Sequence, residues 1–168
     1  MRKMVFILNG SGGVGKDSFV DMVGQYIPVR HESSVTPAKT MAKLAGWNGG
    51  KTEKDRKFLS DLKDLITAYN DTPLKHIIEV TEAFKKGLSG GALFIDVREP
   101  AEIKKAVAAI GAKTVLVTNK NVPVISTNHA DANVANYEYD YVVANDGTLD
   151  DLYDTALKFC QDFGLVDD

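Results

Sequence analysis

A glycine-rich loop between an apolar run and a helical pattern constrains the fold of this chain more than any other feature. Residues 5–19 read VFILNGSGGVGKDSF, with four glycines between positions 10 and 15. Glycine weakens local order, so such a run is expected where the backbone has to approach another group closely. The apolar run 4–8 predicts a buried parallel strand, and a helix is expected after the loop. A strand, a glycine loop and a helix in this order predict a site for phosphate groups.

The glycines match two phosphate-binding motifs, and the first is the dinucleotide-binding motif of dehydrogenases. Gly10, Gly12 and Gly15 have the spacing G-x-G-x-x-G, and Glu32 lies where an acid would bind a ribose. A dehydrogenase also needs a substrate region with an acid or base. A chain of 168 residues offers little beyond a helical middle part to supply one.

The second motif is the phosphate loop of nucleoside-triphosphate enzymes, Gly10-x-x-x-x-Gly15-Lys16. Asp17 stands where this pattern has Ser or Thr, and Ser18 follows one place later. A triphosphate brings about four negative charges, which a lysine offsets, whereas a pyrophosphate needs mainly backbone N–H groups and the helix dipole. Lys16 therefore favours a triphosphate. We expect the whole loop to hold the phosphates of ATP: Gly10, Ser11, Gly12, Gly13, Val14, Gly15, Lys16, Asp17 and Ser18.

Apolar patterns along the rest of the chain alternate between strands and helices. Strands are predicted at residues 4–8, 29–34, 93–97, 114–117 and 141–143. Helices are predicted from the loop to near Pro28, from Thr36, around 58–69, from Thr72, from Pro100 to Gly111 and from Thr148. The threonines at 36, 72 and 148 are expected to be N-caps. The 58–69 helix is expected to be amphipathic, and its apolar face is expected to be buried: Phe58, Leu59, Leu62, Leu65, Ile66 and Tyr69. This order predicts one α/β domain over 1–168, with a parallel sheet covered on both faces and a helical insertion at about 36–88.

Composition excludes several classes of function. The net charge of −3 gives no electrostatic reason to expect binding to nucleic acid or to a membrane surface. No apolar run approaches the roughly 18 residues that a membrane span requires. The single cysteine, Cys160, falls at an apolar position of the last helical pattern, which predicts an inert buried thiol and suits a reducing cytoplasm.

Several stretches together resemble one enzyme family. GKDSF, TPAKTMAKLAGW, KTEKDRKFLSDLK, FIDVREPAEI and YDYVVANDGTLDDL are similar to segments of phage and bacterial deoxynucleoside monophosphate kinases. The resemblance extends more distantly to animal-type phosphomevalonate kinase, and both belong to the adenylate-kinase-like group of phosphate-loop kinases. The most specific parts are Gly-Lys-Asp at 15–17 and Asp-Val-Arg at 96–98.

The resemblance implies a three-layer α/β/α fold with a five-stranded parallel sheet in the order 2-3-1-4-5. It implies that the insertion binds the acceptor and that residues 119–137 form a lid. The implied activity is transfer of the ATP γ-phosphate to a small phosphorylated acceptor, above all a (deoxy)nucleoside monophosphate, with Mg²⁺ as cofactor. Catalysis in such enzymes is mostly positioning and charge neutralisation.

The expected roles at the reacting phosphates fall to the loop and to the end of the third strand. Lys16 would bridge the terminal phosphates. Asp17 could bind the metal directly, hold its water or cap the helix, and Asp96 would meet the magnesium ion from the end of an apolar strand. Arg98 is the best arginine to clasp a transferring or acceptor phosphate in bidentate geometry.

The resemblance also indicates acceptor and base sites. The acceptor phosphate is expected near four basic side chains: Lys39, Arg56, Arg98 and His129. Adenine is expected against the backbone after the last strand, at Asn145, Asp146 and Gly147. Solvated surface roles remain open for Lys39, Arg56 and His129, because mixed-charge runs are common on exposed helices.

The expected lid departs from the family pattern, because residues 119–137 contain no arginine and only one lysine, Lys120. Either Arg98 and Arg56 neutralise the charge, or the protein binds nucleotide and transfers phosphate slowly. Three alternatives therefore stay open. The protein is a kinase of a nucleoside monophosphate, a kinase of a phosphomevalonate or dephospho-coenzyme A type acceptor, or a nucleotide-binding regulatory protein. A guanine-reading motif at 118–121 fails, because Val122 replaces the required Asp.

Overall fold

The chain folds into a parallel sheet between two helical layers. A computed structural model of the protein describes residues 2–123 and 133–167. The strands are β1 (Lys3–Asn9), β2 (Val29–Ser33), β3 (Gly91–Asp96), β4 (Lys113–Thr118) and β5 (Tyr141–Ala144). The helices described are α1 (Lys16–Val23), α2 (Thr36–Leu44), α3 (Glu53–Asn70), α4 (Thr72–Lys86), α5 (Pro100–Ile110) and α7 (Leu149–Asp162).

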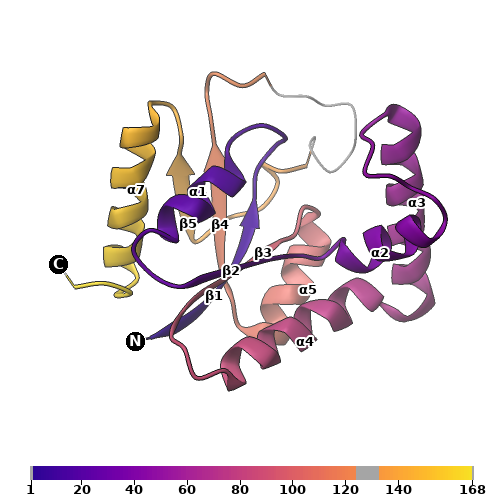
Figure 1. Cartoon of the computed structure of the whole chain (residues 1–168), viewed down its shortest axis with the longest axis horizontal. Coiled ribbons are helices and arrows are strands. Elements are labelled where there is room, and N and C mark those ends of the chain that lie inside the picture. Colours follow the sequence, from indigo (N-terminus) through magenta and orange to yellow (C-terminus); the bar gives the residue numbers. More distant parts are fainter. Residues whose placement is uncertain (1, 124–132, 168) are drawn as a thin grey trace.

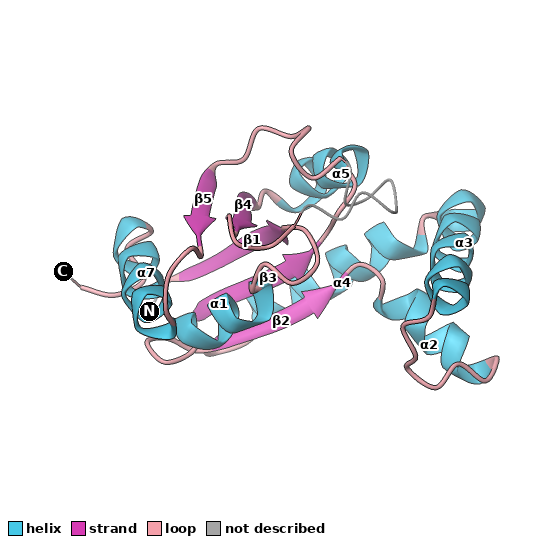
Figure 2. Ribbon diagram, turned by 90° about the horizontal axis from the view of Figure 1, so that it is seen from above, coloured by secondary structure: helices cyan, strands magenta, loops and turns pink. Residues whose placement is uncertain are grey.

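The five strands pair in parallel in the order β2-β3-β1-β4-β5, as the resemblance implied. The strand that precedes the glycine loop, β1, is therefore central, and its neighbours are β3 and β4. Helices α1 and α7 pack together on one side of the sheet, and α4 and α5 pack together on the other (Figures 1 and 2). The predicted three-layer α/β fold is confirmed.

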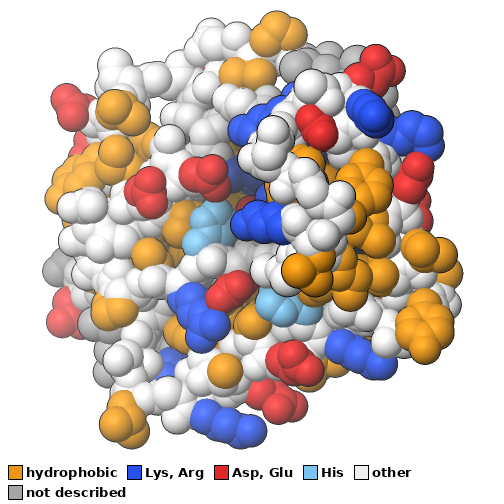
Figure 3. Space-filling view, turned by 45° about the vertical axis from the view of Figure 1, so that its right-hand side comes forward, with side chains coloured by type: hydrophobic (Ala, Val, Ile, Leu, Met, Phe, Trp, Pro, Cys, Tyr) orange, Lys and Arg blue, Asp and Glu red, His pale blue; other side chains and the backbone are white. Residues whose placement is uncertain are grey.

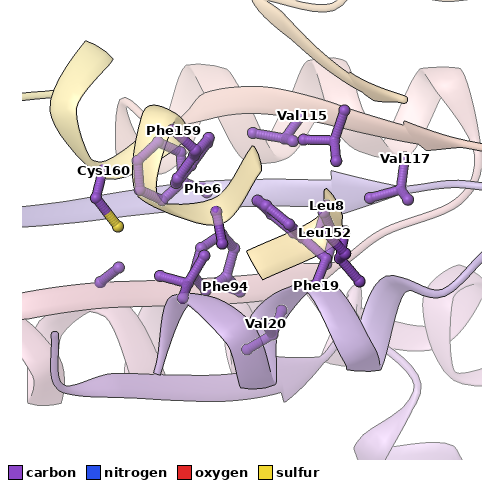
Figure 4. Close-up of a cluster of buried hydrophobic side chains, with 14 of the residues drawn as sticks. Phe6, Leu8, Phe19, Val20, Phe94, Val115, Val117, Leu152, Phe159 and Cys160 are labelled. Atoms are coloured by element: carbon purple, nitrogen blue, oxygen red, sulfur yellow. The ribbon is translucent and has the colours of Figure 1, made fainter. Parts of the chain in front are cut away.

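Alternation along the strands divides the core between the two faces of the sheet. Phe6 and Leu8 of β1 are fully buried under α1 and α7, in an aromatic cluster with Phe94 and Phe159 (Figure 4). The alternate residues Val5 and Ile7 pack instead with side chains of α4 and α5. Because both faces are covered, the central strands β1 and β3 read as nearly continuous apolar runs in the sequence, without alternating polar residues.

The insertion between β2 and β3 forms the three helices α2, α3 and α4, which agrees with the helical content predicted for 36–88. Figure 2 shows α2 and α3 beyond the ends toward which β2 and β3 run. The expected burial of α3 was wrong, since only Ile66 is buried and Leu65 and Tyr69 remain 66% and 84% exposed. Helix α3 packs on α2 and α4 and lies away from the sheet, so one side of it faces solvent. No helix in the described part of the chain is long and apolar enough to cross a bilayer.

The helices start close to the predicted residues, but only one of the three expected threonine caps is present. Thr148 caps α7 in a capping box with Asp151, as expected. Thr36 and Thr72 are the first residues of α2 and α4, and no side chain caps either helix. The proline that follows each threonine already accounts for one N–H that would lack a partner. A capping box at Thr52 begins α3.

The other boundary difference is at the end of α1. The helix ends at Val23, and Gly24 follows it with a turn that brings Ile27 back into the core. The periodic apolar pattern continues through this turn, so the sequence alone predicted a longer helix. Cys160 is buried in α7, and burial raises the pKa of its thiol to about 11, consistent with the inert role predicted for it.

Candidate functional site

The glycine loop leaves the end of β1 and turns into α1 at the carboxyl edge of the sheet. Gly13 and Gly15 have left-handed backbone angles, with φ of 80° and 97°. A side chain at Gly15 would also collide with the side-chain amide of Asn145. At Gly10 a Cβ would lie 2.6 Å from the backbone oxygen of Val117. The loop therefore needs glycine at these positions for close approach to β4 and to the segment after β5.

Lys16 closes the loop on itself. Its Nζ donates to the carbonyl oxygen of Gly10 at 2.7 Å and to that of Ser11 at 3.4 Å. The ammonium group is thus held at the mouth of the loop, at the N-terminus of α1 where the helix dipole also favours an anion. Phosphate oxygens could replace these two carbonyl oxygens without a large movement of the lysine.

Asn145, expected near adenine, contacts the phosphate loop through its side chain. It follows β5, and its Nδ2 donates to the carbonyl oxygen of Val14 at 2.9 Å. Its backbone N–H donates to Thr118 at 2.7 Å. The side chain therefore holds the loop against the β4–β5 edge of the sheet, while the expected contact of this segment with adenine would use backbone groups.

We expect Asn145→Ala to weaken ATP binding about fivefold to tenfold, because one hydrogen bond to the loop is worth about 1 kcal/mol. Asn145→Asp should weaken binding further, since a carboxylate would face a carbonyl oxygen and add negative charge near the phosphates. The measurement is the ATP dissociation constant by titration calorimetry. The control is Thr155→Ala, which removes an exposed hydroxyl that donates to the carbonyl of Asp151 at 2.8 Å within α7. Equal losses in the Asn145→Ala and Thr155→Ala proteins would contradict a positioning role for Asn145.

Asn9 at the end of β1 joins three segments of the site. Its Oδ1 accepts from the N–H of Gly10 at 2.8 Å, and its Nδ2 donates to the carbonyl of Arg98 at 2.9 Å. The same Nδ2 lies 2.9 Å from the hydroxyl of Tyr139, which donates to the carbonyl of Val134. Asn9 is fully buried, so these bonds fix the loop, the end of β3 and the segment before β5 relative to one another.

Asp96 ends β3 beside the loop, as predicted, and contacts a histidine that the sequence analysis did not single out. His31 of β2 has its Nε2 3.1 Å from Asp96 Oδ1, and its Nδ1 lies 3.8 Å from Asp17 Oδ1. In the paired strands His31 is opposite Phe94, and Phe94 contacts Phe19 of α1. Asp96, two residues after Phe94, therefore shares with His31 the sheet face under α1.

The three side chains Asp17, His31 and Asp96 lie close enough together to hold a metal ion, with one ligand atom from each within 4.8 Å of the others. His31 and Asp96 are about three-quarters buried, whereas Asp17 is exposed. The Asp96 carboxylate raises the pKa of His31 above its ordinary value, although burial opposes this effect. Two carboxylates and an imidazole fit a divalent cation, so Asp17 and Asp96 can hold the expected metal.

The predicted acceptor residues occupy separate elements. Arg98 follows β3 directly and is partly buried, with its backbone carbonyl held by Asn9. Lys39 lies on α2 and Arg56 on α3, and both are exposed. His129 lies outside the described residues, as do residues 124–132 of the predicted lid.

The first residues of the expected lid are hydrogen-bonded to the segment that follows β5. The carboxylate of Asp146 accepts from the N–H of Lys120 at 2.8 Å, and its carbonyl accepts from Asn121. A side chain at Gly147 would collide with Asp151, whose carboxylate caps α7. Asp146 and Gly147 thus shape the turn between β5 and α7, where adenine is expected.

The strand order rules against the dinucleotide reading of the glycines. In dinucleotide-binding folds the strand with the ribose-binding acid neighbours the loop strand. Here β3 lies between β1 and β2, so Glu32 is one strand further away. Its carboxylate accepts from Arg30 at 2.9 Å and lies 3.9 Å from His76 of α4, on the opposite sheet face from His31.

His31, Asn9 and the side-chain role of Asn145 escaped sequence reasoning. His31 could be linked to Asp96 only through the pairing register of β2 with β3, which no motif encodes. Asn9 precedes the loop in the quoted stretch, but an Asn after an apolar strand has many uses. Its three partners are up to 130 residues away in the chain.

Comparisons with known proteins identify the fold at low sequence identity. Shikimate kinase from Aquifex aeolicus is 10% identical, with a TM-score of 0.56 over 96% of this chain and 99% of that chain. Dephospho-CoA kinase from Campylobacter jejuni is 16% identical, with a TM-score of 0.52 over 95% and 97% of the two chains. The protein TT1252 from Thermus thermophilus is 14% identical, with a TM-score of 0.57 over the whole of both chains. No protein-family model and no curated protein sequence matches the chain. The likeness therefore establishes the fold that these kinases have, and no substrate.

Proposed function

We propose that the protein is an ATP-dependent phosphotransferase that passes the γ-phosphate of ATP to a small phosphorylated acceptor. One observation carries this proposal. The Lys16 ammonium lies 2.7 Å from the Gly10 carbonyl at the mouth of a glycine loop, and the loop stands beside the carboxyl end of β3 with Asp96 and Arg98. Shikimate kinase and dephospho-CoA kinase, which have the same fold, support phosphate transfer as the reaction.

Each residue of this site has a role in neutralising charge or in orienting phosphates. Backbone N–H groups of the loop and the N-terminus of α1 would bind the β- and γ-phosphates, with Lys16 between them. Arg98 would clasp the transferring phosphate or the acceptor phosphate, because its guanidinium can donate two parallel hydrogen bonds. Asp17 and Asp96 would hold Mg²⁺, which when bound neutralises part of the charge that develops on the phosphates.

For the acceptor we propose a (deoxy)nucleoside monophosphate. The resemblance of the insertion and of Asp96-Val97-Arg98 to the deoxynucleoside monophosphate kinases supports this choice. The insertion lies beyond the carboxyl ends of β2 and β3, where ligands of open parallel sheets bind (Figure 2). Lys39 and Arg56 are the basic residues of α2 and α3 that we propose for the acceptor phosphate. A phosphomevalonate or dephospho-coenzyme A type acceptor would use the same phosphate contacts, so it is the alternative substrate to test.

A nucleotide-binding regulatory protein is a second candidate, favoured by the use of the arginines. The chain has four arginines. Arg2 donates to the carbonyl of Phe163, and Arg30 pairs with Glu32 at 2.9 Å on the edge strand. Arg98 and Arg56 are the two arginines that we propose for phosphate contacts, which is few for fast phosphate transfer.

Nucleotide binding should be visible as thermal stabilisation. We expect ATP with Mg²⁺ at about 100 times its dissociation constant to add roughly 2.7 kcal/mol and to raise the melting temperature by about 5 to 10 °C. NAD and NADP should cause no comparable shift, because β3 separates Glu32 from the loop strand. The measurement is a thermal shift panel with ATP, GTP, NAD and NADP.

A coupled assay for ADP then separates the two candidates. A kinase releases ADP faster when the correct monophosphate is added to ATP, and the acceptor is identified by testing nucleoside monophosphates, phosphomevalonate and dephospho-coenzyme A. ATP stabilisation without acceptor-dependent ADP release would favour the regulatory protein. A shift with NADP and none with ATP would contradict both candidates.

A further inference from the structure

We propose that His31 is a direct ligand of the divalent cation in this site, and that the site prefers a borderline transition-metal ion such as Co²⁺ or Zn²⁺ over Mg²⁺. The phosphate-loop motif assigns only oxygen ligands from the loop and from the end of β3. The inference deepens the proposed function, on which it rests for its role in catalysis. The ion binding itself is measured without nucleotide.

Two buried polar atoms face each other beside the loop. His31 Nε2 and Asp96 Oδ1 are both closed off from solvent, and neither has a hydrogen-bond partner. They lie 3.1 Å apart, within the range of an ion pair. Buried polar atoms without partners are costly, and such pairs are often completed by an ion or a water molecule.

The spacing of the ligand atoms fits one shared ion. Two donors bound to one ion at about 2.0 to 2.2 Å stand roughly 2.8 to 3.6 Å apart in octahedral or tetrahedral geometry. The 3.1 Å between His31 Nε2 and Asp96 Oδ1 is within this range. Asp17, whose side chain is 89% exposed, has room to turn its carboxylate toward the same ion.

The chemical type of the ligand atoms determines which ion the site prefers. Magnesium prefers oxygen ligands and keeps several of its waters, whereas a neutral imidazole suits zinc, cobalt and related ions. One nitrogen and two carboxylates therefore shift the preference away from Mg²⁺. Asp17 contributes to this shift, because it replaces the Ser or Thr hydroxyl of the usual motif with a charged ligand.

A second histidine offers a matched control. His76 of α4 is about as buried as His31, and its Nε2 also lacks a hydrogen-bond partner. It lies 3.9 Å from one carboxylate, that of Glu32. Within residues 2–123 and 133–167 it belongs to no cluster of three possible ligands. Figure 3 shows histidine surface on a face that also carries acidic and basic side chains.

The test is calorimetric titration of the full chain with Zn²⁺, Co²⁺ and Mg²⁺ in the absence of nucleotide. We expect the unmodified protein to bind one Co²⁺ or Zn²⁺ at least tenfold more tightly than Mg²⁺. His31→Gln should weaken Co²⁺ and Zn²⁺ binding by 10-fold to 100-fold or more, at least the effect of losing an outer-shell partner. His76→Gln should bind within twofold of the unmodified protein. His129→Gln is included, because His129 is the third histidine of the chain.

A spectroscopic measurement avoids dependence on variants that could fold poorly. With Mn²⁺ bound to the unmodified protein, electron spin echo spectra should show the coupling of a directly bound imidazole nitrogen. The inference is wrong if this coupling is absent, if His31→Gln binds Co²⁺ as tightly as the unmodified protein, or if the loss follows His76 or His129. If the unmodified protein binds Co²⁺ but is not stabilised by ATP, the proposed function is contradicted and the metal site is still supported.

Discussion

Lys16→Ala should lower kcat/KM for phosphate transfer by about 10³-fold or more. The ammonium group lies at the mouth of the loop, 2.7 Å from the Gly10 carbonyl, and is the one charged side chain that the motif assigns to the terminal phosphates. Groups that stabilise transferring phosphates electrostatically contribute effects of about this size. Coupled ADP release with the best acceptor measures the effect, and ATP-induced thermal stabilisation should shrink in parallel.

The ligand-free Lys16→Ala protein should lose little stability. The lysine bonds to the carbonyls of Gly10 and Ser11 within the loop, and a bond of this kind is worth about 1 kcal/mol, or 2 to 4 °C in this size range. Lys158→Ala is the control, since Lys158 forms an exposed pair with Asp162 within α7 and should have no effect on turnover. A fall of more than about 10 °C in the ligand-free protein would indicate that Lys16 is structural.

Arg98→Ala should lower kcat by about 10²-fold to 10³-fold, with a smaller change in the KM for ATP. The residue follows Asp96 at the end of β3, and Asn9 holds its backbone carbonyl at 2.9 Å, so its position beside the loop is fixed. Arg98→Lys should recover only part of the loss, because an ammonium keeps the charge but cannot donate two parallel bonds to one phosphate. Steady-state kinetics with ATP and acceptor varied separately give both constants.

The other arginines provide the comparison. Arg30→Ala removes an arginine that pairs with Glu32 on the edge strand, and it should leave kcat within twofold. Arg56→Ala should raise the acceptor KM and change kcat less, if α3 contributes to acceptor binding as proposed. An Arg98→Ala protein with full kcat would contradict its role at the transferring phosphate and would favour a different source of positive charge.

The order and type of the elements could be predicted from the sequence because local patterns decide them. Local patterns located all five strands, and the alternation with helices indicated a parallel sheet. The glycines with Lys16 indicated the phosphate loop, since backbone strain and close approach restrict these positions to glycine. The strand order was predicted only from the resemblance to a kinase family, because no local sequence pattern specifies which strands pair.

Predictions failed where a tertiary contact or its absence decides the outcome. The apolar side of α3 reads as a buried face, yet Leu65 and Tyr69 are exposed because α3 stands away from the sheet. The helix after the loop reads as continuous to Pro28, yet Gly24 ends it and Ile27 enters the core through a turn. Periodicity shows that a side chain can be buried, but only the neighbouring elements determine whether it is.

The sequence by itself determined the fold class and placed Lys16, Asp17 and Asp96 at one edge of the sheet, because a parallel strand delivers its carboxyl end there. The tertiary structure alone brought His31 to Asp96 and Asn145 to Val14. These contacts depend on the register of β2 on β3 and on the packing of the segment after β5 against the loop. Register and packing are set by the whole core. His31 and Asp96 are separated by 65 positions in the chain, and Val14 and Asn145 by 131, so no local pattern predicts that they meet.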